Sequence, residues 1–279
     1  MNYPVRKLAD SQMRQAINST SPLLLERAGG VLTLSINAPP TNRMTIEFMD
    51  EFERAIVAAA CDDSVRALVI TATGDENFSV GMDLKQFMAL AGDRARTEAL
   101  LDQRLRVLAA IENMTKPSVV TLFGYCLGGG LELPLSCHFR LVATENAKIG
   151  LPELDLGSVP AWGGTARLTR CVGRAHALDL ILRARKIGGP DALRIGLAHE
   201  VHPMSALKSA AQDLAQTLAA MPPIAIAGVL RCVIGAGDSP LESALAEERA
   251  AFLRCAASAD QAEGLRAFIE KRRAVFTGR

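Results

Sequence analysis

The spacing at which hydrophobic residues recur changes along the chain, and these changes predict a mixed α/β fold. The stretch 23–37 (LLLERAGGVLTLSIN) predicts two strands joined at a glycine pair. Residues 46–60 repeat their apolar positions at helical spacing behind Thr45, which predicts a helix capped by that side chain. The nearly continuous β-branched run at 65–74 is typical of a strand that is buried on both faces.

The same alternation continues through the middle of the chain. We expect a helix at 93–113, a strand at 118–124, a helix at 130–137 and a strand at 139–144. Strands that alternate with helices favour an α/β layout built on right-handed crossovers. The fold class is therefore α/β.

Beyond residue 165 strand signals almost vanish, and no tandem repeat is present. Helical patterns occupy 165–173, 175–185, 189–201, 205–221, 240–257 and 262–276. We therefore divide the chain into a polar leader (1–22), an α/β core (23–200) and a C-terminal helical module (201–279). The pattern leaves open whether this module packs on its own core or on a neighbouring subunit.

Composition narrows the class of protein. With 279 residues, 49% hydrophobic and 22% charged, the chain can build one large soluble domain or a domain with a helical appendage. A net charge of +1 gives no reason to expect nucleic acid or a membrane surface as the partner. There is no run of eighteen apolar residues and no secretory signal near the start. A cytoplasmic enzyme is the expectation.

The six cysteines are scattered and contain no C-x-x-C pair. They are Cys61, Cys126, Cys137, Cys171, Cys232 and Cys255. This spacing fits neither a metal site nor a disulfide framework in a chain of this length, so we expect reduced thiols and no bound metal.

A run of three glycines, Gly128 to Gly130, follows a strand pattern and opens a helix (GYCLGGGLELPLSC). It matches neither G-x-G-x-x-G nor a phosphate-binding P-loop. Glycine lets a ligand approach backbone N–H groups closely, and the N-terminal end of a helix favours negative charge. The turn could hold an oxyanion, or it could be a tight crossing of strand and helix.

A second turn of the same kind lies within 74–87, where a strand and a polar loop lead through Val80-Gly81-Met82 into a probable helix. Two strand-to-helix turns, each exposing an N–H group, suit the enolate oxygen of a thioester. One well-placed donor to a developing oxyanion contributes on the order of 3 kcal/mol.

Two acids stand close to these motifs. Glu132 lies in the first turn of its helix among leucines, which argues against a solvated surface position. Glu153 follows Pro152, and taken alone it fits a surface residue equally well. Two carboxyl groups aimed into one apolar cleft could hold a water between them, one removing a proton and the other delivering one.

Four segments in order resemble the crotonase, or enoyl-CoA hydratase/isomerase, superfamily. They are FSVGMDLKQF, GYCLGGGLELPLSC, IGLPELDLGSVPAWGGTARLTRCVG and GLRAFIEKRRAVF, and the likeness runs from about residue 23 to 276. The resemblance implies a ββα spiral core with a C-terminal helical module that supports oligomerisation. It also implies a homotrimer or a dimer of trimers.

The resemblance implies hydration of a trans-2-enoyl-CoA to a 3-hydroxyacyl-CoA. By this likeness the backbone N–H groups of Met82 and Gly129 hold the thioester oxygen. Glu132 and Glu153 are similar to the acid pair that positions water, with Glu132 activating the water and Glu153 giving a proton to the α-carbon. No metal or redox cofactor is implied, because coenzyme A is part of the substrate.

Further residues are implied to contact the substrate. They are Val80, Asp83, Lys85, Gly128, Trp162, Phe268 and Lys271. Lys85 matches a position near the coenzyme A nucleotide. Phe268 and Lys271 match residues that reach the coenzyme from the C-terminal helix, often across a subunit boundary. Trp162 would line the acyl pocket or pack beneath the loop.

The sequence departs from the family pattern in several places, among them Trp162 in place of a small residue and Met82 in place of alanine. Glu132 and Glu153 are twenty-one residues apart, one more than the common spacing, and a bulge within 139–146 could absorb the surplus. His138 replaces the usual aspartate, and we expect a structural role for it.

Two alternatives to hydration remain. One is another reaction on an acyl-CoA, namely double-bond isomerisation, decarboxylation or thioester hydrolysis. The other is a non-catalytic protein that binds acyl-CoA or RNA.

Overall fold

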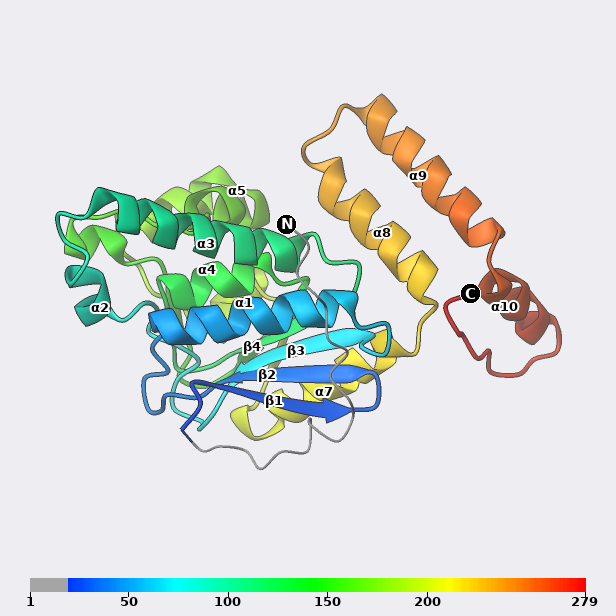
Figure 1. Ribbon diagram of the computed structural model, residues 1–279, viewed down its shortest axis with the longest axis horizontal. Coiled ribbons are helices and arrows are strands. Elements are labelled where there is room, and N and C mark those ends of the chain that lie inside the picture. The colour runs from blue at the N-terminus through cyan, green and yellow to red at the C-terminus, as the bar shows by residue number, and fades with distance from the viewer. Residues whose placement is uncertain (1–19) are drawn as a thin grey trace.

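A six-stranded sheet forms the centre of the protein, seen here in a computed structural model that describes residues 20–279 (Figure 1). Its order is β1-β2-β3-β4-β6-β8; β1 is antiparallel to β2 and the other neighbours are parallel. These strands are β1 (Leu23–Ala28), β2 (Val31–Ile36), β3 (Ala67–Ala72), β4 (Ser118–Leu122), β6 (Phe139–Ala143) and β8 (Glu200–His202). The sheet confirms the predicted α/β class. Most of the predicted leader lies outside the described residues.

Helices cover both faces of the sheet. On one side lie α1 (Ile46–Cys61), α3 (Arg94–Glu112) and α4 (Gly129–Ser136), and on the other side α7 (Met204–Ala219) crosses β3, β4 and β6 (Figure 1). Thr45 caps α1 by accepting a hydrogen bond from the Phe48 N–H, as predicted.

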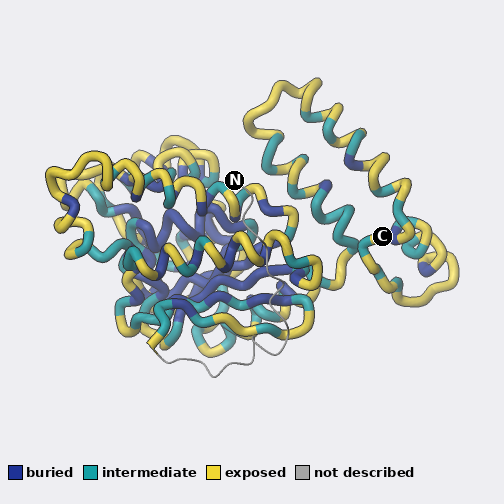
Figure 2. Tube along the Cα trace, in the orientation of Figure 1, coloured by how far each residue is buried: buried dark blue, intermediate teal, exposed yellow. Residues whose placement is uncertain are grey.

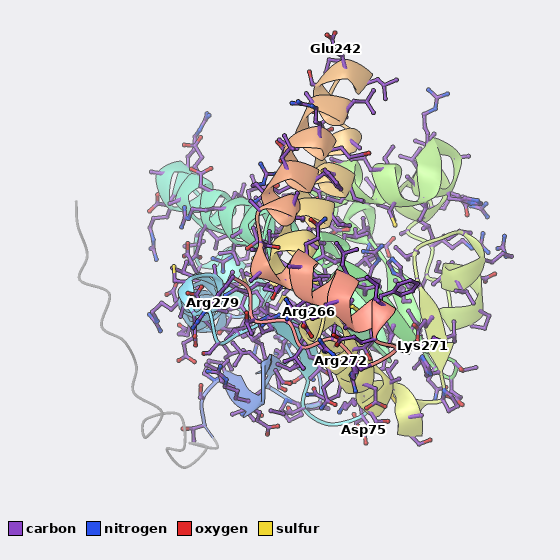
Figure 3. All side chains as sticks on the ribbon, turned by 90° about the vertical axis from the view of Figure 1, so that its right-hand side faces the viewer. Asp75, Glu242, Arg266, Lys271, Arg272 and Arg279 are labelled. Atoms are coloured by element: carbon purple, nitrogen blue, oxygen red, sulfur yellow. The ribbon has the colours of Figure 1, made fainter. Side chains whose placement is uncertain are left out.

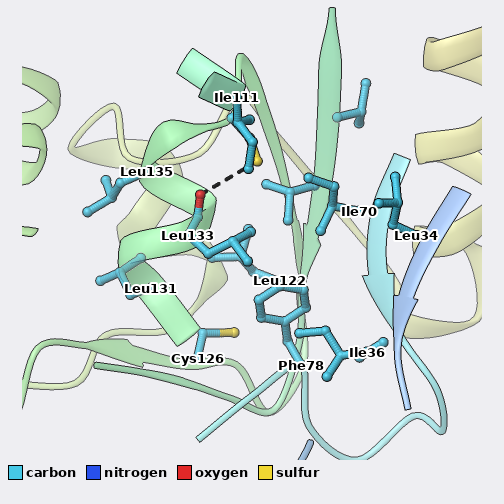
Figure 4. Packing of buried hydrophobic residues seen from close by; sticks show 14 of the residues in the cluster. Leu34, Ile36, Ile70, Phe78, Ile111, Leu122, Cys126, Leu131, Leu133 and Leu135 are labelled. Carbon is cyan, nitrogen blue, oxygen red and sulfur yellow. Dashed lines mark hydrogen bonds between the residues drawn. The ribbon is translucent and has the colours of Figure 1, made fainter. Parts of the chain in front are cut away.

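The two central strands, β3 and β4, are buried at every position, because helices cover both of their faces. One core of apolar side chains runs from the sheet into α1, α3 and α4. Figure 4 shows Leu133 of α4 facing Leu122 of β4 within this core. All eight residues of α4 are buried, so the helix that carries Glu132 is fixed on every side.

The remaining elements of the body connect the sheet to the site. They are α2 (Leu84–Met88), β5 (Tyr125–Leu127), β7 (Lys148–Gly150), the 3₁₀ helix η1 (Glu153–Leu156), α5 (Gly164–Leu182) and α6 (Gly189–Arg194). Strands β5 and β7 form a separate two-stranded parallel sheet. Helix α5 bends at Gly173, which agrees with the two helical segments predicted there.

The C-terminal helices extend from the body as an arm, made of α8 (Pro223–Ala236), α9 (Leu241–Ala256) and α10 (Ala259–Ile269) (Figure 1). Helices α8 and α9 pack side by side, and most of the arm's surface is exposed or half-buried (Figure 2). The predicted boundary at residue 200 falls inside β8, and α7 packs on the sheet. The segment that leaves the body therefore begins after Met221.

Several predicted elements need correction. The helix predicted at 189–201 is α6 followed by strand β8, and the helix predicted at 262–276 ends at Ile269. Strands β5 and β7 and helix α8 were not predicted. Strands β5, β7 and β8 have three residues each, which is too short to show a hydrophobic period.

No one helix among residues 20–279 combines the length and the hydropathy that crossing a bilayer requires. Only α7 and α8 taken together do so, and they are bent by 109° relative to each other.

Candidate active site

Two glycine turns meet at one end of the small sheet. Ser79 and Cys126 form an isolated parallel bridge, which brings the turn after β3 against the turn after β5. Gly81 has φ +90°, and a Cβ on it would lie 2.7 Å from the Leu127 carbonyl oxygen and 3.2 Å from the Gly129 nitrogen. Only glycine permits this approach, which places the N–H groups of Met82 and Gly129 side by side.

The Met82 and Gly129 N–H groups have no hydrogen-bond acceptor among residues 20–279. Their positions are nevertheless fixed. The Met44 N–H donates to the Gly81 carbonyl at 2.9 Å, and the Asp83 N–H donates to the Met44 carbonyl at 3.2 Å. Gly129 is the first residue of α4, where the helix dipole favours negative charge. Two fixed, unused donors of this kind can bind an oxyanion.

Glu132 is only 2% exposed, and its carboxyl group is held by the loop that precedes α5. Its Oε1 accepts hydrogen bonds from the Trp162 N–H at 2.7 Å and from the Gly164 N–H at 2.9 Å. Burial raises the pKa of Glu132 to about 7, although these two bonds act in the opposite direction. The carboxyl therefore changes charge near neutral pH, which suits proton transfer.

Glu153 begins η1 directly after Pro152. Its Oε2 is buried and has no hydrogen-bond partner among the described residues. A Cβ on Gly128 would lie 3.2 Å from the Glu153 Oε1, so this glycine leaves room for the acid. Burial raises the pKa of Glu153, and the charge of Glu153 contributes to the raised pKa of Glu132. The predicted acid pair is thus brought together.

An ion pair fixes the loop that holds Glu132. Arg167 of α5 donates from Nε and Nη2 to the Glu112 Oε2 of α3, at 3.0 and 2.8 Å. Its Nη1 donates to the Trp162 carbonyl at 2.9 Å. The peptide groups that bond Glu132 are therefore tied to two helices of the body.

Trp162 packs directly on Gly129. A Cβ on Gly129 would lie 2.4 Å from the Trp162 Cζ3, and the tryptophan is 4% exposed. A second neighbour of the ring is Arg104 of α3, whose guanidinium carbon lies 5.7 Å from the ring centroid. Arg104 was not predicted, although one signal existed: a charged residue stands on the apolar row of Leu100 and Leu108.

The predicted substrate-binding residues divide into two groups. Val80, Asp83 and Gly128 lie in the two turns. Asp83 caps α2, and the Gly128 carbonyl accepts hydrogen bonds from the Leu131 and Glu132 N–H groups. Lys85 is exposed on α2.

Phe268 and Lys271 lie at the end of the arm, where both are exposed. Figure 3 labels Lys271, which follows α10. Within one chain the structure does not bring them to the acid pair.

The predicted bulge before Glu153 is absent from the sheet. Strands β4 and β6 pair in unbroken register from Val119–Phe139 to Leu122–Val142. The turn between β6 and β7 contains Asn146 at φ +60°. His138 is hydrogen-bonded to Ser118 through Nδ1 and to the Glu112 carbonyl through Nε2, which agrees with a structural role.

The six cysteines are free, and in residues 20–279 no cluster of three or more His, Cys, Asp or Glu side chains could hold a metal ion. Burial raises the pKa of the Cys137 thiol to about 12 and also raises that of Cys126.

The sheet, the paired turns and the helical arm define a protein of the crotonase fold class. Residues 26–279 match the family described as enoyl-CoA hydratase/isomerase, and the chain belongs to that family.

Two curated relatives and one solved structure illustrate the similarity. The chain is 33% identical to a short-chain-enoyl-CoA hydratase of Clostridium acetobutylicum over 90% of this chain and 95% of that one. It is 35% identical to a crotonyl-CoA hydratase of Syntrophomonas wolfei over 91% of this chain and 97% of that one. The solved structure of DspI from Pseudomonas aeruginosa superposes with a TM-score of 0.88 at 32% identity, covering 95% of this chain and 100% of the DspI chain.

Proposed function

We propose that this protein is a hydro-lyase that adds water to a trans-2-enoyl-CoA and forms a 3-hydroxyacyl-CoA. The observation that carries the proposal is a buried Glu132 and a half-buried Glu153 with a buried Oε2, beside two unused backbone donors. The names of the relatives support the same reaction, since they include an enoyl-CoA hydratase and a crotonyl-CoA hydratase.

In the proposed reaction, the N–H groups of Met82 and Gly129 bind the thioester oxygen. When water attacks the β-carbon, the electron pair of the double bond moves toward the carbonyl and an enolate oxygen develops. Each donor contributes on the order of 3 kcal/mol to stabilising that charge. Because the donors are already fixed, little reorganisation accompanies the reaction.

The acid pair moves the protons. Glu132, held through Oε1, removes a proton from the water with its other oxygen as the new C–O bond forms. Glu153 delivers a proton to the α-carbon as the enolate collapses. Burial raises the pKa of Glu132 to about 7, so its protonated and ionised forms are both accessible near neutral pH, and burial also raises the pKa of Glu153. The water supplies the hydroxyl group and one proton, and the two acids exchange protonation states.

The assembly belongs to the same proposal. Exposed apolar side chains on the arm support association of subunits. By the family resemblance the assembly would be a homotrimer or a dimer of trimers, in which Phe268 and Lys271 would reach the coenzyme of a neighbouring subunit. Lys85 would contact the coenzyme nucleotide. A cytoplasmic location and the lack of a cofactor stay predictions.

The test is substitution of each acid by its amide. We expect Glu132→Gln or Glu153→Gln to lower turnover of crotonyl-CoA by about two orders of magnitude or more. The exposed carboxyl variant Glu26→Gln is the matched control and should behave like the unmodified enzyme. Unchanged turnover in either acid variant contradicts the proposal. Product analysis distinguishes hydration from isomerisation, decarboxylation or thioester hydrolysis.

A further inference from the structure

Three buried side-chain atoms in residues 20–279 have no hydrogen-bond partner, and all three lie around the candidate site. One is the Glu153 Oε2, which the proposed reaction uses. The other two are the Nε and Nη2 of Arg104, which it does not use. Buried polar groups are nearly always paired, so two unpaired guanidinium nitrogens beside the candidate site point to a ligand.

Arg104 is held close to the reacting atoms. It is 1% exposed and lies on the inward row of α3, between Leu100 and Leu108. Its guanidinium stacks on the Trp162 ring, and the same ring touches Gly129. The Trp162 ring therefore lies against both Gly129 and the guanidinium of Arg104.

The two edges of the guanidinium differ. On one edge, Nη1 donates to the Gln103 Oε1, and the Gln103 amide nitrogen donates to Asp50 at 2.8 Å and to Glu53 at 2.9 Å. On the other edge, Nε and Nη2 are both unpaired. These two N–H groups point the same way and form the fork that fits the two oxygens of a carboxylate. Desolvation lowers the pKa of Arg104 to about 10, which leaves the side chain charged at neutral pH.

We propose that Arg104 recognises a carboxylate at the far end of the substrate's acyl chain. The preferred substrates are then short trans-2-enoyl thioesters that end in a carboxyl group. The inference rests on the proposed function and names its substrate class. A carboxylate satisfies both free donors of the buried cation, whereas a terminal methyl group leaves them unpaired. Trp162 forms the wall along which the chain passes.

The test compares two thioesters of equal length, trans-2-hexenoyl-CoA and 2,3-dehydroadipyl-CoA, which differ in the terminal methyl or carboxylate. We expect kcat/KM to favour the carboxylate by about tenfold or more, as expected for hydrogen bonds to a charged group. Arg104→Met should remove this preference. Because the measured quantity is a ratio of two substrates, general loss of activity in the variant does not affect it.

Arg106→Met is the matched control, since Arg106 is on the same helix but exposed and paired with Glu53. It should keep the wild-type ratio. A wild-type preference for the methyl-ended thioester, or an equal ratio in Arg104→Met and wild type, overturns the inference.

Binding gives a second readout that does not depend on turnover. Trp162 is the only tryptophan of the chain, so its fluorescence reports on this site. Titration with adipyl-CoA and hexanoyl-CoA should give a lower Kd for adipyl-CoA, and Arg104→Met should abolish the difference. Equal Kd values for the two thioesters in wild type contradict the inference. If no thioester is hydrated but this difference is found, the proposed reaction fails while the carboxylate site stands.

Discussion

At the scale of single residues, the charge of Glu132 sets the pH dependence. Its pKa is raised to about 7 by burial, and the proposed base must be ionised to accept a proton from water. We therefore expect kcat to rise with pH through about 7, falling about tenfold for each unit below that value. Crotonyl-CoA hydration measured between pH 5 and 9 checks this. A rate that is flat across the acid half of this range excludes Glu132 as the base.

The same carboxyl group lowers stability. Its pKa in the folded protein, about 7, lies above the ordinary value of 4.5, so the folded state binds the proton more tightly than the unfolded state. Stability therefore falls as pH rises from 4.5 to 7, by on the order of 3 kcal/mol. Glu132→Gln should remove this penalty and be more stable than wild type at pH 8, with a smaller gain at pH 5. Denaturant unfolding at both pH values measures the stability difference between Glu132→Gln and wild type. The same difference at pH 5 and at pH 8 contradicts this prediction.

At the scale of elements, the Arg167–Glu112 ion pair joins α3, α5 and the loop that bonds Glu132. Arg167→Met should loosen the Trp162 and Gly164 N–H groups, which lower the pKa of Glu132, and should remove a nearby positive charge that acts in the same direction. We expect the midpoint of the pH–rate profile to move upward, and Arg167→Lys to restore it in part. A variant that loses activity without any shift in midpoint would show a purely structural role for Arg167.

The contact between Trp162 and Gly129 gives a second prediction at this scale. Gly129→Ala places a methyl group where the indole ring lies, and the ring must move. We expect kcat/KM to fall by about 100-fold, because the backbone donor is displaced with it. A change in tryptophan fluorescence should accompany the loss. Wild-type fluorescence together with wild-type kcat/KM would contradict this arrangement of ring and turn.

Element lengths explain what the sequence could predict. In long segments such as 46–60 and 118–124, the spacing of apolar residues is enough to predict a helix and a strand. The structure confirms both elements. Glu132 was identified because its apolar neighbours are adjacent in sequence. The loop that bonds Glu132 was not identified, because Trp162 and Gly164 are some thirty residues away and act through backbone groups. Arg104 shows no role until the fold sets it against Trp162.

At the scale of the whole molecule, the arm presents apolar side chains to solvent. They include Val233, Leu245, Phe252, Phe268 and Ile269, each more than half exposed. Such a surface is expected to be covered in the assembly. Phe252→Asp should therefore convert the proposed trimer to smaller species, as measured by light scattering, whereas Glu248→Ala on the same helix should not. A monomeric wild-type protein contradicts the proposed assembly.

The contact between the two glycine turns also bears on how this chain can evolve. A side chain at Gly81 would strike the Leu127 carbonyl, and one at Gly130 would come within 2.3 Å of the Ser79 carbonyl. Both collisions are with main chain, so no neighbouring substitution relieves them. Either acid, by contrast, can be exchanged without disturbing the turns. Descendants of this gene can therefore acquire a new reaction while they keep the proposed binding site for the thioester oxygen. Saturation mutagenesis should find these glycines invariant among all active variants.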